Sequence, residues 1–187
     1  MSTPSLLRSV VAALEQVGIP FMLTGSLAAA WHGAGRATLD IDLVIDPRAD
    51  QIEALIGALS RPDKYISADA VREALTQESM FNVVDTTTGW KADLIIRKSR
   101  PFSRTEFARR LLVEFEGTRL AVATAEDLII AKLEWAKLGA SARQIEDVST
   151  LLRVAAGTLN QAYLDEWIGE LGLADQWHAA RRGTDSA

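Results

Sequence analysis

Hydrophobic residues recur along the chain with two different patterns, and the change between them falls near residue 124. Before this point, segments with helical spacing alternate with short apolar runs that end at Gly, Pro or Asp, as in helices interleaved with strands. After it, apolar residues recur every three or four positions, which indicates helices alone. We therefore predict an α+β fold, with a small mixed sheet flanked by helices over residues 1–123 and a helical region over residues 124–187 packed on that core.

The expected helices have recognisable start and stop signals. Pro4 follows Ser2 and Thr3 at the first helix, and Gly18 ends it. Ser26 is expected to cap the second helix, and Asp46-Pro47 is expected to cap and begin the third. The expected helices cover about residues 4–17, 26–31, 47–59, 68–75, 125–138, 142–156, 160–171 and 174–181.

The expected strands are short and rich in apolar residues. Two pairs of them flank turn sequences, Thr86–Gly89 and Glu116-Gly117. The expected strands cover residues 21–23, 39–45, 81–84, 92–97, 111–115 and 119–123.

Composition excludes several classes of protein. The 187 residues include no Cys and only two His, which excludes disulfides, thiolate metal sites and a His-rich metal site. The net charge of −5 disfavours a generally basic protein that coats nucleic acid. The longest uncharged stretch, residues 16–35, is interrupted by Gly, Pro and polar residues, so we expect a soluble cytoplasmic protein with no membrane segment. The glycine-rich and serine motifs of P-loop, dinucleotide-binding and α/β-hydrolase proteins are absent from the sequence.

An acidic pair is the most informative chemical feature. Asp40 and Asp42 lie two positions apart in an expected strand, so their carboxylates share one face while Ile41 points to the other. Mg²⁺ is a natural partner for paired carboxylates, because it prefers hard oxygen ligands. Asp93 lies in another strand-like segment, and an acid buried there needs a partner. If the two strands pair, three carboxylates converge, enough to hold two metal ions; the alternative is a solvated acidic edge or turn.

The turn Gly25-Ser26 precedes a short expected helix. Gly25 would let the backbone approach a ligand closely, and the Ser26 hydroxyl could donate to a phosphate oxygen. Backbone N–H groups and the positive end of the helix dipole would favour an anion there. A simple helix cap explains Ser26 equally well, and both roles are compatible.

These pieces together resemble the DNA polymerase beta-like nucleotidyltransferase superfamily, and most closely its small bacterial AbiEii-type branch. The resemblance covers about residues 6–155 and rests on Gly25-Ser26, Arg36-x-Thr38-x-Asp40-Ile41-Asp42 with Leu43-Val44-Ile45 behind it, Asp93, and Thr124 to Leu133. It implies that Gly25 and Ser26 hold nucleotide phosphates, that Asp40, Asp42 and Asp93 bind magnesium, and that Arg36 and Thr38 occupy nucleotide-binding positions.

Lys132 lies in the middle of the apolar face of its expected helix, whereas Asp127 lies on the opposite side. Its ammonium must reach the edge of that face or meet an acid or a phosphate, because an unpaired buried charge is costly. The resemblance implies that Lys132 contacts the nucleotide triphosphate. Asp147 in the next helix is expected either to bridge helices by a salt link or to act in catalysis. Thr124 and Asp127 match a capping box.

Residues 97–110 carry six basic side chains and one acid, Glu106, for a net charge of +5. A solvated loop and helix surface is the common explanation, but the segment also suits contact with a phosphate-bearing acceptor.

The expected function is magnesium-dependent transfer of a nucleoside monophosphate from NTP to a tRNA or protein hydroxyl, in a setting that by resemblance is a toxin–antitoxin system with a cognate partner. Two alternatives stay open: a non-catalytic protein that binds nucleotide or acts as an antitoxin by binding a partner, and an NTP hydrolase.

Overall fold

The computed structural model describes residues 5–185, and they fall into two compact units. The first unit runs up to residue 27 and continues over residues 37–123, whereas the second combines residues 28–36 with residues from 124 onward. Pro4, expected to mark the start of the first helix, lies outside the described residues. No helix within the described residues is both long and apolar enough to cross a membrane.

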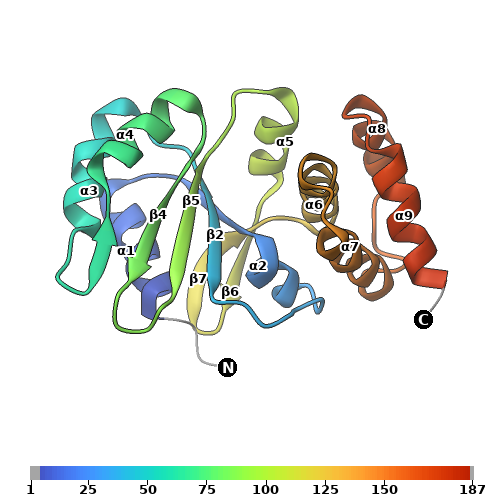
Figure 1. Cartoon of the computed structure of the whole chain (residues 1–187), viewed down its shortest axis with the longest axis horizontal. Helices are drawn as coiled ribbons and strands as arrows, with labels where there is room; N and C mark the ends of the chain where they lie inside the picture. The colour runs from blue at the N-terminus through green and yellow to red at the C-terminus, as the bar shows by residue number, and fades with distance from the viewer. Residues whose placement is uncertain (1–4, 186–187) are drawn as a thin grey trace. The chain divides into compact units, whose positions relative to one another are not determined.

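Among the described residues, the first unit contains one seven-stranded mixed sheet (Figure 1). Its neighbouring strands follow the order β3-β4-β5-β2-β1-β7-β6. The pairs β2–β5 and β1–β7 are parallel, and the other neighbours are antiparallel. The strands are β1 (Phe21–Thr24), β2 (Asp40–Ile45), β3 (Lys64–Ile66), β4 (Met80–Asp85), β5 (Lys91–Ile96), β6 (Leu111–Phe115) and β7 (Thr118–Val122).

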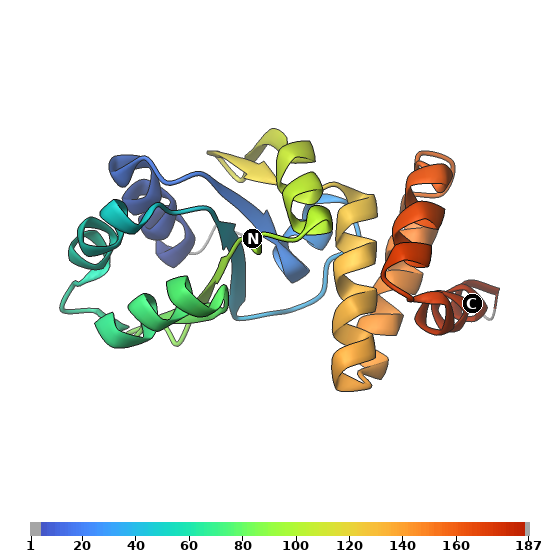
Figure 2. The same ribbon diagram turned by 90° about the horizontal axis from the view of Figure 1, so that it is seen from above.

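Three helices of the first unit pack together and contact β3, β4 and β5: α1 (Ser5–Val17), α3 (Ile52–Leu59) and α4 (Ala68–Gln77). They form one group beside the sheet in Figure 2. Strand side chains alternate between faces, and the face that carries Ile41, Leu43, Val83 and Leu94 is fully buried. The opposite face of the same strands is free to carry polar residues. A short 3-10 helix, η1 (Ala49–Gln51), precedes α3, and α5 (Pro101–Arg109) follows β5.

The second unit is helical. After residue 123 it contains α6 (Ala125–Gly139), α7 (Ala142–Val154), α8 (Gln161–Glu170) and α9 (Ala174–Asp185). Helix α7 contacts both α6 and α9, and α8 packs on α6. Helices α7 and α9 approach closely at Gly183, where an added Cβ atom would lie 2.7 Å from the Ser149 hydroxyl. Helix α2 (Gly25–Trp31) begins in the first unit and ends in the second.

The α+β class and the mixed sheet predicted from the sequence are confirmed, but the predicted role of Asp46 is wrong. Its carboxylate binds Arg97 at 3.0 Å, and the helical segment starts only at Ala49. The backbone N–H of Asp46 donates to the carbonyl of Pro20, so the chain here still continues the sheet. At the start of η1, the Gln51 side chain accepts from the backbone N–H of Arg48. The polar side chain that caps this helical segment is therefore that of Gln51, inside the segment, and not that of Asp46 before Pro47.

Two other expectations at helix starts have different outcomes. Helix α2 begins at Gly25, so Ser26 lies within its first turn instead of preceding it. Thr124 is confirmed as a helix cap, because its hydroxyl accepts from the backbone N–H of Asp127. The three-residue strand β3 was not expected from the sequence pattern, since a strand this short shows no alternation.

Candidate active site

The pairing of β2 with β5 places the three predicted acids on one face of the sheet. The two strands are parallel and in register, with Asp40 beside Lys91 and Asp42 beside Asp93. Residues paired in this way point their side chains to the same face. The neighbouring strands extend the row, because β1 sets Thr24 beside Asp42 and β4 sets Asn82 beside Asp93. The strand pairing that the sequence analysis required, β2 with β5, is therefore present, and it brings Asp40, Asp42 and Asp93 to one face.

Asp93 has the buried partners that its position requires. The residue is only 7% exposed. Its Oδ1 atom accepts a 2.5 Å hydrogen bond from the Asn82 amide, and its Oδ2 atom lies 3.0 Å from the Lys91 ammonium. A buried carboxylate is costly unless it is both paired and hydrogen-bonded, and Asp93 is both.

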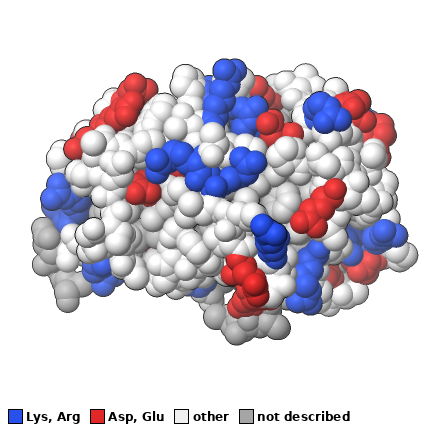
Figure 3. All heavy atoms as spheres, turned by 180° about the vertical axis from the view of Figure 1, so that it is seen from behind, with Lys and Arg blue, Asp and Glu red and all other residues white. Residues whose placement is uncertain are grey.

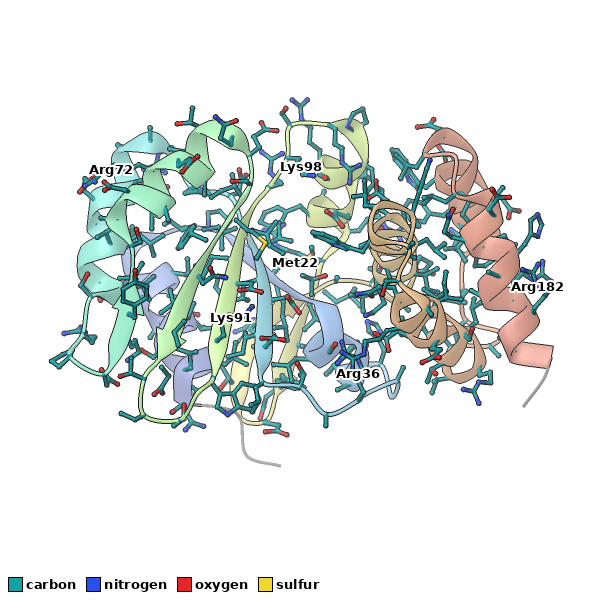
Figure 4. All side chains as sticks on the ribbon, in the orientation of Figure 1. Met22, Arg36, Arg72, Lys91, Lys98 and Arg182 are labelled. Carbon is teal, nitrogen blue, oxygen red and sulfur yellow. The ribbon has the colours of Figure 1, made fainter. Side chains whose placement is uncertain are left out.

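Lys91 supplies positive charge between two of the acids. Its Nζ atom lies 3.0 Å from Asp93 and 3.5 Å from Asp40. The hydrogen bond to Asp93, and then the charges of Asp93 and Asp40, raise the pKa of Lys91 above its ordinary value, although partial burial opposes this shift. Figure 4 shows Lys91 on β5, next to β2. The ammonium thus stands where a cation would be attracted to this carboxylate face.

Gly25 makes room for the third acid. Its φ angle is +64°, and a Cβ atom built on it would lie 1.9 Å from Oδ2 of Asp42. A side chain at position 25 would therefore meet the carboxylate directly and also adopt an unfavourable backbone conformation. Ser26 follows in the first turn of α2 and is 4% exposed. The turn predicted to hold phosphates and the acid predicted to hold metal are immediate neighbours.

Thr38 shapes the entry to β2. Its hydroxyl accepts from the backbone N–H of Asp40 at 3.0 Å and lies 3.4 Å from the Asp40 carbonyl. These local hydrogen bonds fix the chain where the acidic strand begins, which is a structural role for Thr38.

Lys132 lies in the second unit and is paired with an acid. It is 5% exposed, and its Nζ atom lies 2.7 Å from Asp147 and 3.2 Å from the Gln144 side-chain oxygen. The Nε atom of Arg36 also binds Asp147, at 3.3 Å, and Figure 4 labels this arginine. Of the roles that the sequence leaves open for Asp147, the structure contains the salt link between helices α6 and α7. The triphosphate contact implied for Lys132 stays a prediction.

Asp127 differs from its expected place on the solvent side of α6. The residue is 0% exposed, and its carboxylate accepts hydrogen bonds from Thr124 at 2.6 Å and from Tyr163 at 2.5 Å. Tyr163 belongs to α8, which covers this side of α6. A helical wheel places residues around one helix, but it does not show which neighbours pack there.

The oxygen ligands of the carboxylate face, the sheet face that carries Asp40, Asp42 and Asp93, suit a hard divalent cation. These side chains do not, however, surround one common point. Within residues 5–185, no group of three or more His, Asp or Glu side chains is arranged to hold a metal ion. The chemistry fits nevertheless, since Asp40, Asp42 and Asp93 share one face and Asp40 and Asp93 already share the Lys91 cation. Metal binding would require the Lys91 ammonium to move away from these two acids.

Sequence reasoning missed Lys91 and Asn82. Lys91 stands two positions before Asp93, so the strand alternation that joins Asp40 to Asp42 could have placed it on the same face. Asn82 carries no comparable signal, because its contact with Asp93 depends on the register between β4 and β5.

Comparisons with known proteins support the fold. No protein-family model and no curated protein matches the chain. The solved structure of the antibiotic-resistance factor ANT(2'')-Ia is similar, with 13% identity and a TM-score of 0.58 over 93% of this chain and 95% of that one. The same factor in complex with adenylyl-2''-tobramycin gives a TM-score of 0.56 at 13% identity, over 92% of this chain and 97% of that one.

A third similar structure is that of an antigenic nucleotidyltransferase-like protein from Paracoccidioides brasiliensis. It is 19% identical to this chain, covers 94% of it and 91% of its own chain, and has a TM-score of 0.56. Likeness at this level of identity concerns the architecture alone. The chain therefore has a nucleotidyltransferase-like fold.

Proposed function

We propose that the protein is a metal-dependent nucleotidyltransferase of the AbiEii-type branch. One observation carries the proposal: Asp40, Asp42 and Asp93 share one face of a nucleotidyltransferase-like sheet, next to the Gly25-Ser26 turn. In the reaction, an acceptor hydroxyl oxygen forms a bond to the α-phosphorus of an NTP. The bond from this phosphorus to the bridging oxygen breaks, pyrophosphate leaves, and the hydroxyl proton passes to a base or to solvent.

The chain's own groups have separate tasks in this proposal. Asp40, Asp42 and Asp93 would hold Mg²⁺, which when bound offsets the negative charge of the triphosphate. Ser26 would donate its hydroxyl to a phosphate oxygen, and the absence of a side chain at Gly25 would let that phosphate approach the backbone. Asn82 would keep Asp93 oriented through its amide hydrogen bond.

The acceptor that we propose is an RNA such as tRNA. The crystal structure of ANT(2'')-Ia with adenylyl-2''-tobramycin shows an adenylyl group joined to a small acceptor in a protein of this fold. In this chain, the basic segment 97–110 directly follows the strand of Asp93, which favours an acceptor with many phosphates. The setting that we propose from the AbiEii-type resemblance is a toxin–antitoxin system, and the cytoplasmic location is proposed from the sequence alone.

A second candidate function is nucleotide binding without catalysis. The contacts of Lys91 with Asp93 and Asp40 favour it, because an internal cation already balances part of the charge that a metal would balance. A protein of this kind would act through a bound partner rather than by transfer.

The test uses mass spectrometry of tRNA, total protein and an aminoglycoside after incubation with each NTP and Mg²⁺. We expect nucleotide addition to tRNA and a loss of about a hundredfold or more in the Asp40→Asn, Asp42→Asn double variant. Asp46→Asn is the matched control, since this acid of the same chain segment binds Arg97 and should be dispensable. Equal transfer by the double variant would end the proposed metal site, and nucleotide binding without any transfer would favour the second candidate.

Metal binding is measured separately by titration with Mn²⁺ in the absence of NTP. The double variant should lose binding. Lys91→Met keeps all three acids and removes the competing cation, so it should bind Mn²⁺ more tightly than the natural protein. Weaker binding by Lys91→Met would mean that Lys91 supports this site rather than competes for it.

A further inference from the structure

Strand β6 is an exposed edge of the sheet. It ends the strand order, and β7 is its only strand neighbour within the described residues. Leu111 is 41% exposed and Leu112 is 62% exposed. Proteins commonly protect such edges with Lys, Pro, bulges or very short strands. Strand β6 contains no Lys or Pro and pairs with β7 without a bulge, and Glu114 is its one charged residue, whereas the opposite edge, β3, has only three residues and includes Lys64.

The hairpin geometry shows which backbone groups of β6 point outward. Phe115 pairs with Thr118 across the turn Glu116-Gly117, whose φ angles are +46° and +77°. These positive angles are typical of the tight turns whose flanking residues exchange backbone hydrogen bonds. Hydrogen-bonded and non-hydrogen-bonded pairs then alternate along the hairpin. Leu112 and Glu114 consequently direct their N–H and C=O groups to the open edge.

We infer that β6 pairs with β6 of a second copy of this chain, in antiparallel register about a twofold axis at Val113. In this register, Leu112 lies opposite the partner's Glu114, and Glu114 lies opposite the partner's Leu112. Both are outward-pointing positions, so their backbone groups can exchange hydrogen bonds. The sheet then continues from one copy into the other.

The side chains complement one another in the same register. On one face, Leu111 lies opposite the partner's Phe115, and the two Val113 side chains meet at the axis. A second copy therefore matches this edge in backbone hydrogen bonding and in apolar contact.

The apolar surface also extends beyond the strand. Leu112 lines a depression of about 650 Å³ whose walls are partly apolar, at Pro20 and Phe21, and partly charged, at Glu15, Arg110 and Arg119. Exposed apolar surface next to an open strand edge is typical of a docking surface.

The test compares variants that differ only in the sign of one charge. Analytical ultracentrifugation should find the natural chain at twice the monomer mass. L112E sets like charges opposite the partner's Glu114 and should weaken dimerisation about tenfold or more, whereas L112K sets opposite charges there and should weaken it far less. The double variant L112E/E114K should restore the dimer. A natural chain that stays monomeric at every concentration, or equal effects of L112E and L112K, would overturn the inference.

Cross-linking tests the axis directly, since the chain contains no cysteine. Residues of a non-hydrogen-bonded antiparallel pair lie about 4.5 Å apart between Cα atoms, close enough for a disulfide. V113C should therefore form a covalent dimer on oxidation. L112C should not form one, because in this register Leu112 lies opposite the partner's Glu114 and is two positions away from the partner's Leu112. A dimer in which V113C fails to cross-link would contradict the inferred pairing.

Discussion

Gly25 is the residue at which backbone conformation and the proposed chemistry meet, because the Asp42 carboxylate occupies the space that a side chain would need. Gly25→Ala should reduce stability and abolish Mn²⁺ binding, since the added methyl group would displace that carboxylate. Gly89→Ala is the matched control. Gly89 also has a positive φ angle, +75°, but nothing lies within 4 Å of its added Cβ atom.

The control Gly89→Ala should lower the free energy of unfolding by about 1 kcal/mol through backbone strain alone, and it should leave Mn²⁺ binding unchanged. Thermal unfolding and Mn²⁺ titration of both variants measure the two effects. If Gly25→Ala and Gly89→Ala lose equal stability and both keep Mn²⁺ binding, Asp42 does not depend on the space at Gly25.

At the scale of single residues, alternation along a strand was enough to predict that Asp40 and Asp42 share a face. The need of a buried acid for a partner correctly indicated that Asp93 would be paired. The identity of that partner could not be predicted, because it follows from strand register and side-chain position. The prediction for Asp46 failed for a related reason. The local sequence before Pro47 indicates a helix cap, but the backbone N–H of Asp46 donates to the carbonyl of Pro20 and keeps this residue in the sheet.

The turn between β4 and β5 depends on one carboxylate. Oδ1 of Asp85 accepts hydrogen bonds from the hydroxyl and backbone N–H of Thr87 and from the backbone N–H of Thr88. The hydroxyl contact and these N–H groups lower the pKa of Asp85 from 3.8 to about 2. This turn fixes the register of β4 against β5, and thereby the place of Asn82 next to Asp93.

Protonation of Asp85 should therefore destabilise the fold at low pH. Because its folded pKa is below its unfolded pKa, its contribution to stability is complete above pH 3.8 and is lost as the pH falls toward about 2. Asp85→Asn should be less stable than the natural chain at pH 7, and the difference should shrink over this interval. Urea unfolding at a series of pH values measures it. A difference that stays constant down to pH 2 would contradict this role of Asp85.

Helices α6 and α7 are joined by the buried pair of Lys132 and Asp147. Asp147→Ala should destabilise the second unit by about 3 kcal/mol, because it leaves the buried Lys132 ammonium with the Gln144 side chain as its one partner among the described residues. The double variant Lys132→Met, Asp147→Leu should recover most of that loss. Glu146→Ala, an exposed neighbour on α7, should change stability by less than about 0.5 kcal/mol.

Urea unfolding followed by tryptophan fluorescence measures these differences, since Trp167 and Trp177 are buried in the second unit. A loss in Asp147→Ala no larger than that in Glu146→Ala would show that the pair contributes little to stability.

At the scale of elements, prediction succeeded where segments were long or strongly periodic. Most of the order of helices and strands in the first unit and the change to helices after residue 123 followed from spacing, but β3 and the helix α5 were not expected. The misses are short or depend on distant partners. Strand β3 forms because it pairs with β4. Asp127 is buried because α8 packs on α6. Neither partner is visible in a local window of sequence.

At the scale of the whole molecule, the net charge of −5 conceals an uneven distribution. Residues 97–110 contribute +5, so the rest of the chain sums to −10. On the face drawn in Figure 3, Lys and Arg side chains form separate groups with acidic side chains between them. On this face, a phosphate-rich acceptor would meet local basic groups rather than a continuous basic surface.

Within the basic segment, the structure distinguishes the side chains available to such an acceptor. Arg97 binds Asp46, and Arg110 donates to the carbonyl of Phe107. Lys98 and Arg104 are exposed on either side of the start of α5, and Figure 4 labels Lys98 in the loop after β5. We therefore expect Lys98 and Arg104 to make the phosphate contacts.

Removing both charges should weaken tRNA binding and also its dependence on salt. For Lys98→Ala, Arg104→Ala, the slope of log affinity against log salt concentration should fall by about 1.5 to 2, because two fewer phosphates are neutralised. The control Arg8→Ala, Arg61→Ala removes the same charge from exposed positions outside the segment, and it should keep the natural slope. Fluorescence anisotropy of labelled tRNA over a salt series measures both. Equal slopes for the two double variants would mean that net charge, and not this segment, determines binding to RNA.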